Sequence, residues 1–75
     1  MTRKQKLKEI SKITELVYLY DGSDEWCVTR VYKSGIRCVR SWINPYYGTQ
    51  VEFKFFSYED LLNWKTICVD IRSWK

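Results

Sequence analysis

Two runs of β-branched and aromatic residues, separated by only three residues, dominate the middle of the chain. They cover residues 26–32 and 36–43, and residues of these kinds are enriched in β-strands. The intervening Lys33-Ser34-Gly35 fits a three-residue hairpin loop whose glycine takes the left-handed conformation. The sequence therefore predicts an antiparallel β-hairpin over residues 26–43.

A further strand is predicted after the hairpin, beyond a turn at residues 44–48 that contains the one proline of the chain. Residues 50–55 alternate between apolar and polar side chains, which is typical of a strand with one buried face. The alternation predicts that Val51, Phe53 and Phe55 point inward and that helices cover this face.

Each end of the chain carries a helix signal. Thr2 is a plausible N-cap for a helix over residues 3–13, with a strand following within residues 16–20. Ser57 precedes Asp60 by three residues, which resembles a capping box. This spacing predicts a helix from residue 58 to at least residue 67, with Trp74 as its furthest end.

An apolar stripe supports the second helix, although its last part is ambiguous. Leu61, Trp64, Cys68 and Ile71 recur at helical spacing. Residues 67–71 are also rich in β-branched side chains, so a frayed end or a short strand remains an alternative there.

These signals together predict an α+β fold. We expect a small antiparallel sheet of three or four strands, with an N-terminal helix and a C-terminal helix packed on one face. A chain of 75 residues is too short for a second core, so residues 1–75 are expected to form a single domain.

Several classes of function are disfavoured by what the sequence lacks. There is no histidine, the commonest general base and metal ligand, and the three cysteines have no paired spacing. No glycine-rich phosphate loop occurs either. We therefore expect no enzymatic activity, no catalytic residues, no metal site and no cofactor.

Cysteine use and hydropathy also suggest a location. An odd number of cysteines in so small a chain favours reduced thiols over a disulfide framework. Residues 16–20, the longest apolar run, are too few to cross a membrane, and the Lys-rich start does not resemble a signal peptide. The expected location is cytoplasmic, without membrane association.

The distribution of charge points to a candidate binding surface. The net charge is +4, and residues 26–43 contain four basic residues and no acidic ones. If Trp26, Arg30 and Tyr32 share a face with Arg40 and Trp42, guanidinium groups and aromatic rings form one surface. The predicted binding residues are Arg30, Arg37, Arg40, Trp26, Trp42, Tyr32, Tyr46 and Tyr47.

Three interpretations of this surface remain open. The arginines are ordinary solvated side chains lying over rings, or they bind another protein with an acidic surface, or they bind nucleic acid or a nucleotide-like molecule. Tyr46 and Tyr47 either fold back over an exposed tryptophan or form a recognition loop. Self-association through an unpaired strand edge is a further possibility.

The favoured hypothesis from sequence is a small non-enzymatic binding module that acts on an acidic protein surface. Its small size and lack of catalytic groups are also typical of accessory or inhibitor proteins of phages and mobile elements. We expect charge reversal at both Arg30 and Arg40 to abolish binding without unfolding the protein.

Overall fold

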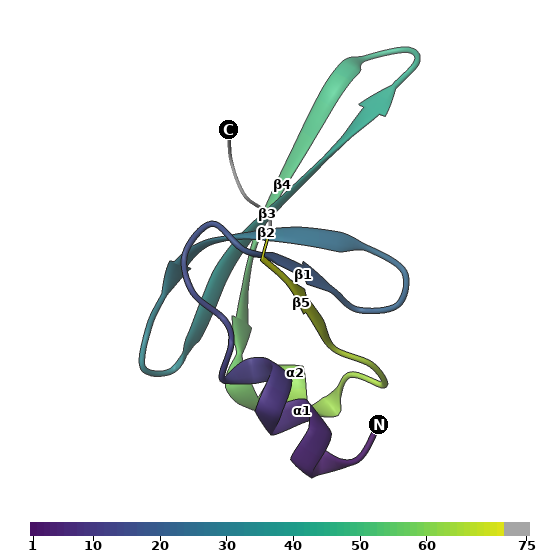
Figure 1. The fold of residues 1–75 in the computed structure, drawn as a ribbon. Helices are drawn as coiled ribbons and strands as arrows, with labels where there is room; N and C mark the ends of the chain where they lie inside the picture. Colours follow the sequence, from purple (N-terminus) through teal and green to yellow (C-terminus); the bar gives the residue numbers. More distant parts are fainter. Residues whose placement is uncertain (72–75) are drawn as a thin grey trace.

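The computed structural model describes residues 1–71, which form an antiparallel sheet with two short helices at one end (Figure 1). The α+β class is therefore confirmed. In chain order the elements are α1 (Arg3–Ile10), β1 (Tyr18–Tyr20), β2 (Glu25–Val31), β3 (Gly35–Asn44), β4 (Gly48–Ser57), α2 (Tyr58–Asn63) and β5 (Cys68–Asp70).

The sheet has five strands in the order β4-β3-β2-β1-β5, each antiparallel to its neighbours. The predicted count of three or four strands is therefore too low. The additional strand is β5, which pairs with β1 through Leu19 opposite Val69. The short β5 thus forms one edge of the sheet, and the much longer β4 forms the other.

The predicted hairpin is formed by β2 and β3, but its glycine has a different role. The backbone N–H of Tyr32 donates to the carbonyl of Gly35 at 2.8 Å. Gly35 itself starts β3 opposite Ser57, and it is not among the described residues with positive φ. A Cβ on Gly35 would lie 2.8 Å from the Ser57 Cα, so glycine is needed here because β4 approaches closely.

Both predicted helix starts are confirmed, whereas both predicted helix ends are too late. Thr2 and Ser57 form capping boxes with Gln5 and Asp60, satisfying backbone donors that the first turn leaves free. α1 ends at Ile10, and α2 ends at Asn63 where the chain becomes extended at Trp64. The short strand at residues 68–70 is thus the correct alternative, while Trp74 lies outside the described residues.

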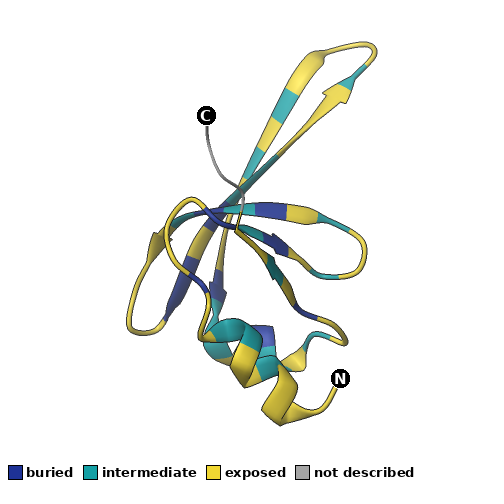
Figure 2. Cartoon of the chain, in the orientation of Figure 1, coloured by how far each residue is buried: buried dark blue, intermediate teal, exposed yellow. Residues whose placement is uncertain are grey.

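The two helices lie at one end of the sheet and do not cover a whole face of it as predicted (Figure 1). The core lies between them and the sheet face that carries Phe56 (Figure 2). Leu61 of α2 is fully buried and belongs to one cluster with Ile36 and Phe56. Phe56 also packs edge-to-face between Trp26 and Trp64, with both ring centroids at 5.0 Å. The full buried cluster comprises Ile13, Val17, Leu19, Trp26, Val28, Ile36, Cys38, Phe56, Leu61 and Ile67.

The face of β4 predicted to point inward in fact points outward. Phe56 is the buried aromatic residue of β4, whereas Val51, Phe53 and Phe55 are exposed. Because side chains alternate along a strand, burial of Phe56 forces Phe55 to the opposite face. The prediction was wrong because two adjacent phenylalanines allow either choice of face, and the helices cover the one that carries Phe56.

Candidate functional site

A β-bulge in β2 separates the arginines that were predicted to lie together. The register between β2 and β3 shifts between Val28 and Arg30, which leaves Thr29 as the extra residue. Before the shift, Val28 faces Cys38 in the core; after it, Arg30 faces Arg37. An extra residue exchanges the faces of all side chains that follow it.

Arg30 and Arg40 therefore project from opposite faces of the sheet. Arg37 shares the face of Arg30, whereas Arg40, three residues further along β3, shares the face of Cys38. The predicted common surface of Arg30 and Arg40 does not exist. The sequence contains no glycine or proline at the bulge that could have indicated it.

The Arg40 side chain is bound by other side chains of the same protein. Its guanidinium contacts the Asp24 carboxylate at 2.9 Å and the Glu52 carboxylate at 3.1 Å. It also lies over the rings of Trp26 and Trp42, at 5.0 and 5.1 Å from their centroids. The hydrogen bond that Arg40 donates to Glu52, supported by the charge of Asp24, raises the pKa of Arg40 above its ordinary value.

These contacts give Arg40 a structural role. It links the β1–β2 loop, through Asp24, to the edge strand, through Glu52, and it covers the buried ring of Trp26. The expectation that Arg40 can be reversed in charge without affecting the fold is therefore not retained. Trp26, also a predicted binding residue, lies in the core.

The face opposite the helices carries the two arginines that have no such ion pairs. We call this surface the open face, defined by Arg30, Arg37, Val51, Phe53 and Phe55. Arg30 and Arg37 are directly opposite each other on β2 and β3, and neither forms an ion pair within residues 1–71. Like charges directly opposed across two strands are destabilising.

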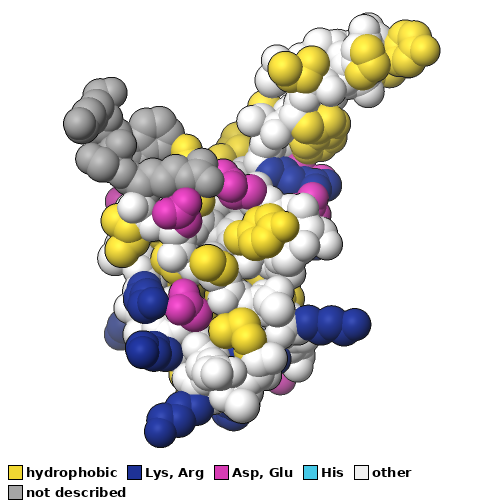
Figure 3. All heavy atoms as spheres, turned by 45° about the vertical axis from the view of Figure 1, so that its right-hand side comes forward, with side chains coloured by type: hydrophobic (Ala, Val, Ile, Leu, Met, Phe, Trp, Pro, Cys, Tyr) yellow, Lys and Arg dark blue, Asp and Glu magenta, His cyan; other side chains and the backbone are white. Residues whose placement is uncertain are grey.

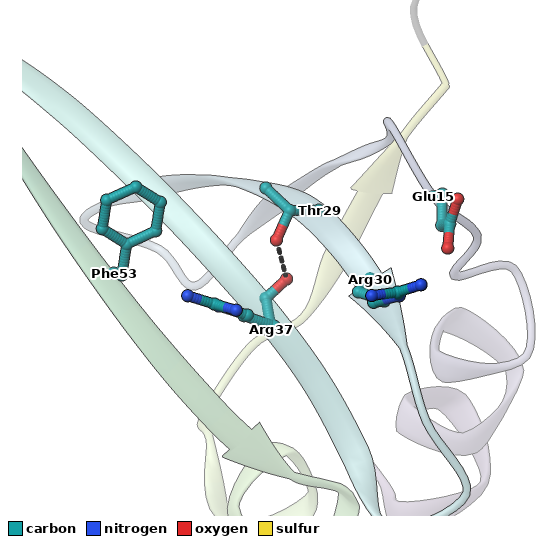
Figure 4. A pocket seen from close by; sticks show the side chains of 5 residues that line it. All are labelled: Glu15, Thr29, Arg30, Arg37 and Phe53. Atoms are coloured by element: carbon teal, nitrogen blue, oxygen red, sulfur yellow. Dashed lines mark hydrogen bonds between the residues drawn. The ribbon is translucent and has the colours of Figure 1, made fainter.

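A shallow hollow on the open face is lined by these two arginines together with Glu15, Thr29 and Phe53 (Figure 4). The Arg37 guanidinium lies 5.7 Å from the centroid of the Phe53 ring, and the Thr29 hydroxyl donates to the Arg37 carbonyl at 3.0 Å. The two guanidinium groups and the ring are thus available from the same side.

Aromatic side chains extend the open face along β4. Phe53 is 62% exposed and Phe55 is 49% exposed. The ring centroid of Phe55 lies 6.2 Å from that of Tyr32, another predicted binding residue. Phe53 and Phe55 were not predicted as binding residues because the alternation in β4 suggested burial. Contiguous exposed apolar side chains of this kind usually mark an interaction surface.

The distal ends of β3 and β4 project from the sheet as a two-stranded arm, residues 41–51 (Figures 1 and 2). Pairing between β2 and β3 ends at Val39, so beyond this point β3 pairs with β4 alone. Hydrophobic side chains are visible along the arm (Figure 3). The exposed large hydrophobic residues of the arm are Trp42, Ile43, Tyr46, Tyr47 and Val51.

The turn of the arm holds its two tyrosines away from the body. The Asn44 side-chain oxygen accepts hydrogen bonds from the backbone N–H groups of Tyr46 and Tyr47, at 2.8 and 3.2 Å. Their side chains are 89% and 81% exposed. The alternative in which these rings cover a tryptophan is therefore wrong, and the recognition loop remains a prediction.

No group of three or more potential metal ligands occurs within residues 1–71. Cys27, Cys38 and Cys68 are free thiols, and burial raises the pKa of Cys38 to about 12. No helix in this part of the chain is long and apolar enough to span a membrane.

Comparison with known proteins gives no relative: no family model, no curated protein and no solved structure matches this chain.

Proposed function

We propose that this protein is a non-enzymatic binding module that recognises another protein through its open face. The partner surface would combine acidic side chains, which meet Arg30 and Arg37, with an apolar area that covers Phe53 and Phe55. The arm, with Tyr46 and Tyr47 at its end, would extend the contact. The site thus keeps the predicted acidic partner but lies on the opposite side of the sheet from Arg40.

The observation that carries this proposal is the direct opposition of Arg30 and Arg37. Two like charges at this position cost stability, and within the described chain no carboxylate forms an ion pair with either of them. A carboxylate supplied by a partner would remove the repulsion and form charge-assisted hydrogen bonds. Exposed arginine and aromatic side chains are also the residues that dominate binding energy at protein interfaces.

Charge reversal at Arg37 tests this site. Arg37→Glu places opposite charges across β2 and β3, so the fold should be retained or stabilised by about 0.2–1 kcal/mol. Binding should weaken about tenfold or more, because a repulsive charge replaces an attractive one. Partner capture from a lysate of the native cells, quantified by mass spectrometry, measures the change for the wild type and the variant.

Arg3→Glu is the matched control, because it makes the same change in charge at an exposed position at the start of α1. We expect this variant to capture the same protein in wild-type amounts. Equal capture by a folded Arg37→Glu variant would show that the open face is not the binding site.

A second candidate is nucleic acid or a nucleotide, favoured by the two guanidinium groups and the Phe53 ring around one hollow. The Glu15 carboxylate lines the same hollow and would repel a phosphate, so we place this candidate second. Titration of a fluorescent oligonucleotide at several salt concentrations distinguishes the two. Phosphate contacts would give tight binding with a steep salt dependence, whereas a protein-binding module would bind the oligonucleotide weakly.

A further inference from the structure

The edge strand β4 is long and regular. It forms one edge of the sheet, and its ten residues pair with β3 in an unbroken register. It contains no proline and no bulge. Natural edge strands are usually short or interrupted, because a long regular edge offers free backbone groups to another strand.

We infer that two copies of this chain associate by antiparallel pairing of β4 with β4, about a two-fold axis at Phe53. The sequence of β4 is complementary to itself in this register. Glu52 lies opposite Lys54 of the second copy, and Lys54 lies opposite Glu52 of the second copy. Opposite charges at directly facing positions stabilise a strand pair.

Symmetry restricts the registers that are possible. Each face of the sheet must continue into the same face of the second copy, because side chains alternate along a strand. A two-fold axis between two antiparallel copies of β4 must therefore pass midway between facing copies of the same residue. An axis at Glu52 would oppose two glutamates, and an axis at Lys54 would oppose two lysines. Of these three adjacent registers, only the one at Phe53 opposes both charges with the opposite sign.

The same register also brings together the exposed apolar residues of β4. Phe53 lies beside Phe53 of the second copy, and Val51 lies beside Phe55 on either side. All three are about half exposed or more in the single chain. Pairing would join two open faces into one and shield an apolar stripe that is otherwise in water.

The contacts that Glu52 and Lys54 make within the chain are compatible with this pairing. Glu52 uses one carboxylate oxygen for Arg40, which leaves the other for a second cation. The Lys54 ammonium lies 5.3 Å from the Phe56 ring centroid, and it forms no ion pair within the described part of its own chain.

A charge-exchange experiment tests the inference. Analytical ultracentrifugation should show a concentration-dependent dimer for the wild type. Glu52→Lys and Lys54→Glu should each be monomeric, because each variant opposes like charges at both positions. Mixing the two variants should restore a dimer, because every facing pair is then of opposite sign. A folded wild type that stays monomeric, or a mixture of the two folded variants that stays monomeric, would overturn the inference.

Cysteine crosslinking tests the register and leaves the contact of Glu52 with Arg40 intact. In a Cys68→Ser background, Phe53→Cys places two thiols at the axis, where facing Cα atoms are about 4.5–5.5 Å apart and within the range of a disulfide. Val51→Cys is the matched control, because its two copies would be about 14 Å apart along the strands. Rapid oxidation to a dimer is expected for Phe53→Cys alone, and equal crosslinking of both variants would exclude this register.

This inference does not depend on the proposed function. Arg37 lies on β3, one strand in from the β4 edge, and its side chain reaches the Phe53 ring but its backbone takes no part in pairing between two β4 strands. Arg37→Glu should therefore dimerise even if it no longer binds a partner. Partner capture and dimerisation can therefore be measured separately, and either proposal can fail while the other holds.

Discussion

At the scale of single residues, Gly35 is the position where the packing leaves least room for a side chain. Gly35→Ala would place a methyl group against Ser57 and Phe55, within 2.8 and 2.7 Å of existing atoms. One of these atoms belongs to the backbone of β4, so relief requires a strand to move. We expect the free energy of unfolding to fall by about 1–3 kcal/mol, measured by urea denaturation.

Ser34→Ala provides the control, because Ser34 is the exposed neighbour in the same loop. Its free energy of unfolding should change by less than about 0.5 kcal/mol. A Gly35→Ala variant as stable as Ser34→Ala would mean that β3 and β4 separate easily at this point.

Gly35 also shows what the sequence could predict at this scale. Its position in a hairpin was evident from the β-rich runs on either side. The physical role of Gly35 was not evident, because the restriction comes from its pairing partner Ser57 in β4, which is 22 residues away in the sequence. Local turn rules cannot include a constraint that arises from such a distant neighbour.

At the scale of elements, α1 is attached to β5 by a charged side chain. The Glu9 carboxylate accepts a hydrogen bond from the Val69 N–H at 3.1 Å and forms an ion pair with Lys12 at 3.0 Å. The hydrogen bond from Lys12, and then that from Val69, lower the pKa of Glu9 below its ordinary 4.5. Ionised Glu9 therefore stabilises the folded state.

The sign of the pH dependence follows from this lowered pKa. The stabilisation is fully present above pH 4.5 and is lost as the pH falls through the folded pKa. Glu9→Gln should lower the free energy of unfolding at neutral pH by about 0.5–1 kcal/mol. The difference from the wild type should shrink in acid, as measured by thermal denaturation over a pH series.

Glu15→Gln serves as the comparison, because Glu15 is exposed and forms no ion pair in the described residues. Its effect on stability should be small and should not follow the Glu9 pattern. If Glu9→Gln and Glu15→Gln show the same pH profile, the contact between α1 and β5 contributes nothing measurable.

Helix starts were predictable and helix ends were not, for a physical reason. The caps at Thr2 and Ser57 are local, since each involves residues three apart. The end of α2 depends instead on β1, whose free edge accepts residues 68–70 as β5. The helical spacing of Leu61, Trp64 and Cys68 was real in the sequence, but tertiary pairing and the β-branched side chains of residues 66–69 outweighed it.

At the scale of the whole molecule, the fold class was predictable but the choice of sheet face was not. Strand and helix signals correctly gave an antiparallel α+β fold. The Phe55-Phe56 pair allowed either face of β4 to be buried, and the bulge at Thr29 exchanged the face of Arg30. The predicted binding residues were therefore divided, with Arg30, Arg37 and Tyr32 on the side of Phe55, and Arg40 with Trp26 on the core side.

The three cysteines are buried to different extents, and this predicts the order in which their thiols react. Cys68 is exposed at the edge strand β5, Cys27 is partly buried in β2, and Cys38 is buried in β3. Burial, with a smaller effect from Glu25, raises the pKa of Cys27. Burial, with a smaller effect from Cys27, raises the pKa of Cys38 to about 12. Because the thiolate is the reactive form, we expect alkylation first at Cys68, then at Cys27, and at Cys38 only when the sheet opens.

The raised pKa of Cys38 also determines how the stability of the fold depends on pH in alkali. An unfolded chain ionises Cys38 above its ordinary pKa of 9.0, whereas the folded chain does not until about 12, so stability should fall as the pH rises between these values. Time-resolved labelling with peptide mapping measures the order, and Cys68→Ser should remove only the fastest phase. Labelling of Cys38 in the folded protein as fast as that of Cys27 would show that β2 and β3 separate without global unfolding. The hairpin that supports Arg30 and Arg37 would then be too mobile to present them as a preformed surface.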